Sequence, residues 1–248
     1  MSKTKLTSII LAAGVGSRMK SDLPKVLHRV GGKPMVQRVI EAVRGVDIKD
    51  VRVVIGYKGD LVRRALNNLE VDFFVQEQQL GSGHGAGCAI DNDMQGSVLI
   101  INGDHPLVSS KSLQKVISEY SKLSCDLAIV SVQKDVSSQF GRIVRSVDER
   151  FIKIVEASDA TSEQMQITEC NSGVYIINTD NFKHYIGKLD KNNAQKEYYL
   201  TDIASMMAED GLRVEVIEGD DSLGIGINSQ EDLAEIDSLF SESTKVNE

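Results

Sequence analysis

Short apolar runs alternate with helical patterns through the first half of the chain. Runs of aliphatic and β-branched residues occupy 6–11, 51–55, 71–75, 97–101 and 127–132. Apolar residues at helical spacing fill the intervals 35–43, 60–69, 84–90 and 111–123. Strands joined by helices at this pace form parallel sheets with right-handed crossovers. The sequence therefore predicts an α/β fold with a Rossmann-like, doubly wound, mixed but mostly parallel sheet.

The pattern changes near residue 135. Short β runs with alternating charges follow at 141–145 and 151–156, which is typical of a small exposed sheet. Buried strands are expected at 174–177 and 213–217, and helices at 203–209 and 229–240. We interpret this region as a small β-sheet inserted into one domain over residues 1–240. Residues 241–248 are polar and are predicted to fray.

Composition excludes several classes of function. The 248 residues carry a net charge of −8, whereas non-specific binding of nucleic acid needs a basic surface. No apolar run approaches the ~20 residues of a membrane span. Cys88, Cys125 and Cys170 show no metal-ligand spacing and are typical of a reducing compartment. We expect a soluble, cytoplasmic protein that binds neither nucleic acid nor membrane.

The first strand leads into a glycine turn within residues 8–28. Small residues from 12 to 17 leave the backbone N–H groups open to an anion, and Arg18 and Lys25 follow. Met19 replaces the third glycine of the dinucleotide fingerprint, and the Gly-Lys-Ser/Thr end of a Walker A loop is absent. A tight structural turn is the alternative, but the two cations favour a polyphosphate ligand.

Two further loops follow strands of the same predicted sheet. Gln76 and Gln79 precede a glycine-rich helix start, and their amides can recognise a base. A flexible polar loop is the alternative there, and His84 is interpreted as a helix-start residue. Asp104 ends the strand at 97–101, where a carboxylate suits Mg²⁺ shared with substrate phosphates. A simple turn before Pro106 is the alternative at Asp104. Because ligands bind at the carboxyl ends of such strands, these loops are expected to converge.

Seven motifs together resemble the uridyltransferase domain of the bifunctional N-acetylglucosamine-1-phosphate uridyltransferases, the GlmU family. The first two combine Gly-x-Gly-x-Arg with a later Pro-Lys, as in sugar-nucleotide pyrophosphorylases generally. The motifs cover residues 11–19, 21–28, 79–84, 103–104, 141–143, 192–195 and 197–202. The resemblance spans roughly residues 5–240 and implies the nucleotide-diphospho-sugar transferase fold. It implies a nucleotide-binding half over 1–133 and a sugar-binding half over 134–240.

Matching positions supply the roles that the resemblance implies. Arg18 and Lys25 would be catalytic, and Asp104 and Asn228 would bind Mg²⁺. The nucleotide-binding residues would be Leu11, Ala12, Ala13, Gly14, Gln76, Gly81, Ser82, Asn102 and Gly103. The sugar-binding residues would be Gly141, Glu156, Asn171, Glu197, Tyr199 and Thr201. The last three belong to a polar and aromatic patch, residues 193–202, which is equally compatible with a capped helix.

The implied reaction is Mg²⁺-dependent transfer of UMP from UTP to N-acetylglucosamine-1-phosphate, giving UDP-N-acetylglucosamine and pyrophosphate. The alternatives are a nucleotidyltransferase for another sugar-1-phosphate and an inactive UDP-sugar-binding protein. The chain has Asn102 where the family usually has an aromatic residue before Gly-Asp. The acetyltransferase β-helix of the family is not expected here, so we expect a monomer without β-helix trimerisation.

Overall fold

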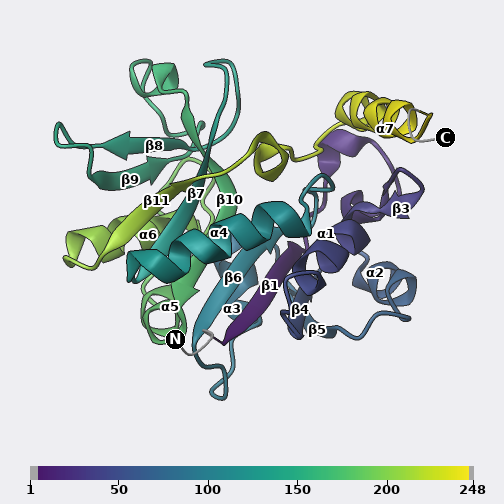
Figure 1. Ribbon diagram of the computed structural model, residues 1–248, viewed down its shortest axis with the longest axis horizontal. Helices are drawn as coiled ribbons and strands as arrows, with labels where there is room; N and C mark the ends of the chain where they lie inside the picture. The colour runs from purple at the N-terminus through teal and green to yellow at the C-terminus, as the bar shows by residue number, and fades with distance from the viewer. Residues whose placement is uncertain (1–4, 246–248) are drawn as a thin grey trace.

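A mixed, mostly parallel sheet forms the centre of the molecule, as the sequence predicts (Figure 1). The computed structural model describes residues 5–245, with side chains described to residue 240. The main path follows the order β11-β7-β10-β6-β1-β4-β5. These strands are β1 (Leu6–Ala12), β4 (Asp50–Ile55), β5 (Asp72–Val75), β6 (Ser97–Asn102), β7 (Leu127–Gln133), β10 (Glu169–Asn178) and β11 (Val214–Glu218). Only β10 runs antiparallel to its neighbours along this path, pairing with β6 and β7.

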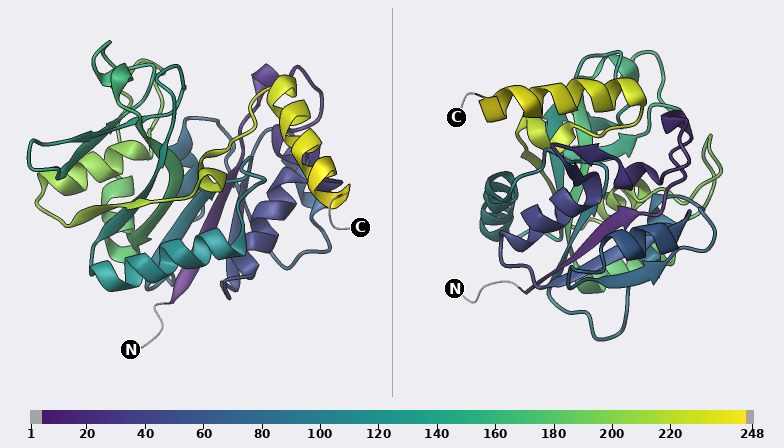
Figure 2. Two further views of the ribbon diagram at one scale, coloured as in Figure 1. Left: turned by 45° about the horizontal axis from the view of Figure 1, so that its top comes forward. Right: turned by 90° about the vertical axis from the view of Figure 1, so that its right-hand side faces the viewer.

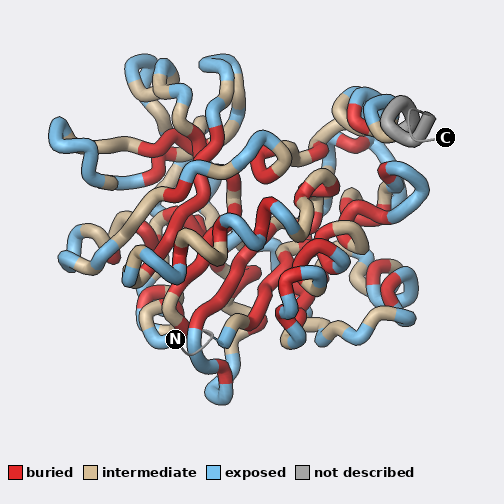
Figure 3. The backbone as a smooth tube through the Cα atoms, viewed as in Figure 1, coloured by how far each residue is buried: buried red, intermediate tan, exposed pale blue. Residues whose placement is uncertain are grey.

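Helices cover both faces of the sheet because each central strand is apolar on both sides. In β1, Ile10 and Ala12 belong to one hydrophobic core and Ile9 to the other, as the two-residue period of a strand requires. The first core includes residues of α1 (Met35–Arg44), α2 (Gly59–Ala65) and α4 (Ser110–Leu123). The second includes residues of α3 (Ser82–Cys88), α5 (Thr179–Ile186) and α6 (Thr201–Glu209). Figure 3 shows the buried strands between more exposed helices.

The small inserted β-sheet is confirmed as an antiparallel hairpin of β8 (Arg142–Arg145) and β9 (Phe151–Val155). It joins the main sheet because β8 pairs with β10 at Cys170↔Arg142. β10 then continues between β6 and β7. The second half of the chain thus contributes a central strand to the sheet that the first half begins.

Several element boundaries differ from the sequence predictions. α2 ends at Ala65, before the expected 69, because two asparagines with poor helix propensity follow Leu66. α3 begins at Ser82, two residues early, within the glycines. α5 was not predicted from the sequence; its first turn is capped by Asn178 Oδ1, which accepts from Asp180 N at 2.9 Å. α7 (Gln230–Lys245) continues five residues past its expected end at 240, and residues 246–248 lie outside the described residues.

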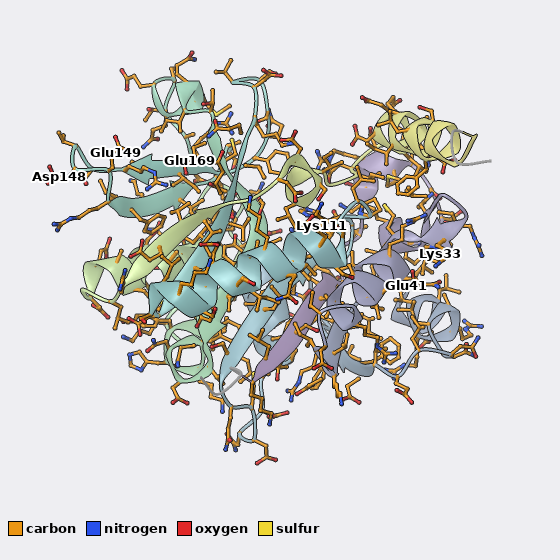
Figure 4. All side chains as sticks on the ribbon, viewed as in Figure 1. Lys33, Glu41, Lys111, Asp148, Glu149 and Glu169 are labelled. Carbon is orange, nitrogen blue, oxygen red and sulfur yellow. The ribbon has the colours of Figure 1, made fainter. Side chains whose placement is uncertain are left out.

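α7 lies against a two-stranded hairpin of β2 (Arg29–Val30) and β3 (Lys33–Pro34), away from the N-terminal end of β1 (Figure 2). A small separate core joins them: Met19, Val30, Met35, Ile227 and Ile236. Lys33 also pairs with Glu41 of α1, with Nζ 2.8 Å from Oε2 (Figure 4). The first and last parts of the chain are therefore packed together beside the predicted phosphate loop.

The described part of the chain contains no helix that is both long and apolar enough to cross a membrane. The three cysteines are all unpaired. Cys170 is buried, and Cys88 and Cys125 are partly exposed.

Candidate active site

A cleft of about 500 Å³ opens at the carboxyl ends of β1, β5 and β6. It brings together nearly all of the residues predicted to contact the nucleotide. Its lining residues are Leu11, Ala12, Ala13, Gly14, Val15, Gly16, Ser17, Lys25, Val26, Gln76, Gln79, Gly81, Ser82, Gly85, Asn102, Asp104 and Glu197. The three separately predicted loops thus converge as the parallel sheet requires.

The glycine turn shapes one wall of the cleft. Gly16 has φ +64°, and a Cβ there would lie 2.6 Å from Lys25 Cβ, so only glycine lets the turn pack against the lysine stem. Two 3₁₀ turns, η1 (Ser17–Met19) and η2 (Lys25–Leu27), then carry Arg18 and Lys25. The turn therefore brings both predicted cations beside the cleft.

Lys25, Asp104, Asn228 and Arg18 form a linked polar cluster, which we call the ionic centre. Lys25 Nζ donates to Asp104 Oδ2 and, at 3.0 Å, to Asn228 Oδ1. Arg18 Nη2 donates to the same Asn228 oxygen at 3.0 Å. Burial raises the pKa of Asp104, but the charges of Lys25 and His105 and the hydrogen bond from Lys25 together outweigh burial and hold this pKa below its ordinary value. Asp104 is therefore a carboxylate within this centre.

The oxygens of the ionic centre fit a Mg²⁺ ion. Asp104 Oδ2 and Asn228 Oδ1 already share one ammonium group, so the two atoms lie close enough to share a cation. Asp104 Oδ1 is buried and has no hydrogen-bond partner among the described residues. Over the same residues, no group of three or more His, Cys, Asp or Glu side chains could hold a metal. A site with two protein oxygens, completed by substrate phosphates, matches the usual preference of Mg²⁺.

His105 lies behind the ionic centre, and the sequence analysis assigned it no role. It is 3% exposed, and its Nε2 lies 3.6 Å from Asp104 Oδ1. Burial lowers the pKa of His105 more than the Asp104 charge raises it. In the sequence, only its position next to Asp104 could have indicated that His105 lies at the site.

At the other end of the cleft, the amide of Gln76 is held in one orientation. Its Nε2 lies 3.0 Å from Gly81 O and 3.0 Å from His84 Nδ1. Because a carbonyl can only accept, the atom facing Gly81 must be nitrogen, and the second hydrogen goes to His84. Among the described residues none donates to Gln76 Oε1. This oxygen is therefore left to accept a hydrogen bond from a ligand.

The loop beside Gln76 is hydrogen-bonded to the segment that precedes α6. Gly83 N donates to Tyr198 O at 2.8 Å, and Leu200 N donates to Ser82 Oγ at 3.0 Å. Gly81 has φ +109°, and a Cβ there would lie 2.6 Å from Tyr198 O. Glycine is therefore required at Gly81, and the polar patch 193–202 meets the nucleotide cleft.

A second cavity of about 190 Å³ adjoins the first. The two share Leu11, Ser82 and Asn102. The second is lined by Leu11, Ser82, Asn102, His105, Gln139, Phe140, Gly141, Glu156, Asn171, Ser172, Gly173, Tyr175, Leu200 and Thr201. Four of the predicted sugar-binding residues line it, and they come from three strands or strand ends and from α6. We call it the smaller cavity.

Glu156 is the acidic residue of the smaller cavity. Thr201 Oγ1 donates to its Oε1 at 3.0 Å. Burial raises the pKa of Glu156, and this outweighs the hydrogen bond from Thr201. Opposite it, Asn171 Nδ2 donates to Tyr175 Oη at 2.6 Å, while Asn171 Oδ1 accepts from Gly173 N at 3.1 Å. The smaller cavity is therefore lined by fixed polar groups.

Three predicted residues lie elsewhere than expected. Gly103 is not among the lining residues of the cleft, because its N–H donates to Leu11 O at 2.8 Å behind the wall. Tyr199 lines neither cavity, and its buried side chain donates to Asp159 Oδ2 at 3.2 Å. Glu197 lines the larger cleft and not the smaller cavity. Gly103 and Tyr199 would therefore support the site from behind it.

The fold also adds residues to the walls that were not predicted from the sequence. The larger cleft gains Val15, Ser17 and Gly85, and the smaller cavity gains Gln139, Phe140, Ser172, Gly173 and Tyr175. Phe140 stands directly before the Gly-Arg-Ile motif, which was a usable signal. Ser172, Gly173 and Tyr175 lie at a register shift in β10 between Asn171 and Tyr175, which no local sequence pattern indicates.

Known proteins resemble this chain over most of its length. "Bifunctional protein GlmU" of Bdellovibrio bacteriovorus is 40% identical over 229 residues, covering 92% of this chain and 50% of the relative. The protein of the same name from Carboxydothermus hydrogenoformans is 42% identical over 232 residues, covering 93% and 52%. The chain thus spans about half the length of the curated relatives that it matches.

A solved structure shares the fold. The crystal structure of a putative glucose-1-phosphate thymidylyltransferase from Bacillus anthracis, in complex with a sucrose, matches with a TM-score of 0.74 and 21% identity. The match covers 95% of each chain. The family described as "MobA-like NTP transferase domain" matches residues 8–169, from β1 to the start of β10. The chain belongs to this family of MobA-like NTP transferase domains.

Proposed function

We propose that the protein transfers UMP from UTP to N-acetylglucosamine-1-phosphate, releasing pyrophosphate and forming UDP-N-acetylglucosamine, with Mg²⁺ as cofactor. One observation carries the proposal: the Lys25–Asp104 pair of the ionic centre opens into a nucleotide-sized cleft that adjoins a smaller polar cavity. The resemblance to the GlmU uridyltransferase domain supplies the choice of substrates.

The orientation of Gln76 supports a uracil base. Its free Oε1 can accept from an N–H group of the base, because both of its own hydrogens are used within the protein. Uracil carries such a donor at N3, whereas cytosine carries an acceptor there. UTP is therefore favoured over CTP.

The smaller cavity supports a sugar. Its fixed polar groups include Glu156 and Asn171, which can bond to hydroxyl or amide groups. It meets the larger cleft at Leu11 and Asn102. A sugar phosphate placed there would present its phosphate toward the nucleotide.

In this reaction a phosphate oxygen of the sugar phosphate attacks the α-phosphorus of UTP. A new P–O bond forms there, the bond from the α-phosphorus to the bridging oxygen breaks, and pyrophosphate leaves. The attacking group is already anionic, so no side-chain nucleophile is needed. Lys25 and the loop N–H groups would bind the α-phosphate, and Arg18 would hold the departing phosphates. Mg²⁺, when bound by Asp104 and Asn228, would supply further neutralisation of phosphate charge.

A matrix of nucleotides and sugar phosphates, with pyrophosphate release as the readout, tests the proposal. The pair of UTP and N-acetylglucosamine-1-phosphate should give the highest kcat/KM. A higher value with another pair would identify a nucleotidyltransferase of different specificity. No release with any pair, together with binding of UDP-sugars, would identify a binding protein.

Single variants test the roles within the ionic centre. Arg18→Ala or Asp104→Ala should each lower kcat about 10²- to 10³-fold, as expected for losing one charged group at the reacting phosphates. Lys33→Ala is the matched control, because it also removes a positive charge, but from the hairpin beside α1 and not from the ionic centre (Figure 4). Near-normal turnover in either active-site variant would contradict the assigned mechanism.

A further inference from the structure

Arg142, at the start of β8, is a fully buried cation with an unusual set of partners. Its side chain is 0% exposed. Among the described residues it forms no ion pair with a carboxylate. Its guanidinium instead donates to three backbone carbonyls: Val136 O at 3.0 Å, Ser138 O at 2.9 Å and Phe140 O.

All three carbonyls belong to one loop, residues 134–141, which connects β7 to β8. The loop contains no helix or strand. Its own backbone bonds are few: Lys134 N to Thr168 O at one end and Ser138 N to Asp135 O within it, both at 2.9 Å. Gly141 O accepts from Asn171 N at 2.8 Å at the other end. Between these ends, Arg142 is the group that gathers the loop carbonyls at one point.

The opposite side of the same loop lines the smaller cavity. Gln139, Phe140 and Gly141 stand there together with Glu156 and Asn171. The approach is close, since a Cβ on Gly141 would lie 2.9 Å from Ile154 Cγ2 and 3.2 Å from Glu156 Oε2. A shift of the loop by about an ångström would therefore change the width of the cavity.

Stabilisation of the fold does not by itself explain why a buried arginine occupies this position. A guanidinium loses its hydration on burial, and apolar residues of similar volume are often at least as stabilising as buried charges. Arg142 Nε is moreover buried without a hydrogen-bond partner among the described residues. What the planar fork does supply is several donors in fixed directions, which can hold three carbonyls of an irregular loop.

We propose that Arg142 is a positioning residue for the acceptor substrate. By fixing loop 134–141 it sets the wall of the smaller cavity and hence the affinity for the sugar phosphate. It touches neither the nucleotide cleft nor the ionic centre. The part of this inference that concerns the sugar rests on the proposed function, whereas the ordering of the loop does not.

The main test replaces Arg142 with Met, which keeps much of the volume and removes every donor. Arg142→Met should raise KM for the sugar phosphate about tenfold or more, with KM for UTP changed less than about twofold. Amide hydrogen exchange in residues 136–141 should become faster, while exchange in β1 and β6 stays unchanged. Arg142→Lys keeps the charge without the fork, and should give an intermediate KM for the sugar phosphate.

The control is Arg145→Met on the same strand. Arg145 donates to both oxygens of Glu169, which is labelled in Figure 4, at 2.6 and 2.7 Å, and to Glu149 O at 2.9 Å. Among the described residues it has no hydrogen bond to loop 134–141. This variant should leave both KM values and loop exchange unchanged.

Each other outcome has a definite meaning. Equal changes in both KM values, or unchanged exchange in 136–141, would overturn the positioning role. If Arg142→Met does not fold, Arg142→Lys decides, and a normal KM for the sugar phosphate in that variant overturns the proposal. Absence of turnover in the unmodified protein overturns the proposed function instead, while loop exchange in the variants still decides whether Arg142 orders the loop.

Discussion

Gln76 shows how a single buried residue can determine specificity. It is 4% exposed, and two acceptors, Gly81 O and His84 Nδ1, bind its two amide hydrogens. An amide alone could recognise a base in either orientation, because it carries both a donor and an acceptor. The surrounding acceptors remove this ambiguity, so that only the oxygen is free for the base. His84, interpreted from the sequence as a helix-start residue, therefore contributes to the orientation of Gln76.

The variant Gln76→Glu tests this orientation. A carboxylate cannot donate to Gly81 O, so a buried carbonyl loses its partner and the side chain must turn. We expect kcat/KM for UTP to fall about 10- to 100-fold and the preference for UTP over CTP to shrink. Steady-state kinetics with both nucleotides measure the change, and Gln114→Glu on the exposed face of α4 is the control. An unchanged UTP/CTP ratio would contradict the role of Gln76.

Asp202, in the first turn of α6, is an acid in an unfavourable environment. Burial, together with the charges of Asp190 and Asp159, raises the pKa of Asp202 to about 6. The folded state therefore binds a proton more tightly than the unfolded state, whose carboxyl has an ordinary pKa near ~3.9. The ionised form destabilises the fold, and this effect grows as pH rises from about 4 to 6 and is complete above that range.

Asp202→Asn should remove this pH dependence. At pH 8 the variant should have a higher free energy of unfolding than the unmodified protein. Near pH 4 the difference should shrink, because the native carboxyl is then already protonated. Urea denaturation of both proteins at both pH values measures this difference in the free energy of unfolding. If the difference is no larger at pH 8 than at pH 4, the carboxylate of Asp202 does not destabilise the fold.

At the scale of elements, the residues of the ionic centre come from loops at the ends of strands and from the segment before α7. β1 supplies the glycine turn, β6 supplies Asp104, and the segment before α7 supplies Asn228. Gln230, the first residue of α7, also donates from Nε2 to Met19 O at 3.1 Å, which ties the helix to the loop that carries Arg18. α7 therefore holds both sides of the ionic centre. The rigid sheet fixes the third contributor, Asp104.

α5, which the sequence analysis missed, depends on a local cap. Asn178 Oδ1 accepts from the backbone N–H groups of Asp180 and Asn181, at 2.9 and 3.3 Å. Asn178→Ala should lower the free energy of unfolding by about 1 kcal/mol, since it leaves these donors unpaired. Chemical denaturation measures the loss, with Asn92→Ala at an exposed turn as control. An unchanged unfolding midpoint would mean that packing of Phe182 against the core, without the cap, defines the start of α5.

At the scale of the whole molecule, the two halves of the chain share one sheet and two adjoining cavities. Leu11 and Asn102 of the first half line both cavities, while β10 of the second half separates β6 from β7. A ligand that fills only the larger cleft contacts mainly the first half and Glu197. A ligand that fills both cavities contacts residues from both halves of the chain.

The product of the proposed reaction should therefore stabilise the protein more than its nucleotide part alone. At equal concentrations, UDP-N-acetylglucosamine should raise Tm by more than UDP, because tighter binding to the native state gives greater stabilisation. Thermal unfolding followed by fluorescence measures both shifts. Equal shifts would show that the smaller cavity does not take the sugar. Arg142→Met should reduce the advantage of UDP-N-acetylglucosamine without changing the shift from UDP.

The sequence by itself determined most of the local structure, because apolar periodicity records which side of each segment is buried. It identified the strands of the main sheet, the glycine turn at Gly16 and the separate candidates Lys25, Asp104 and Asn228. Only the tertiary structure decided which of these meet. Lys25 and Asn228 are 203 residues apart in sequence, and their contact depends on strand order and on the packing of α7. The orientation of Gln76 and the contacts of Arg142 with its loop were likewise undetermined by the sequence. Each depends on backbone carbonyls, and for Gln76 also on His84 Nδ1, whose positions follow from the fold.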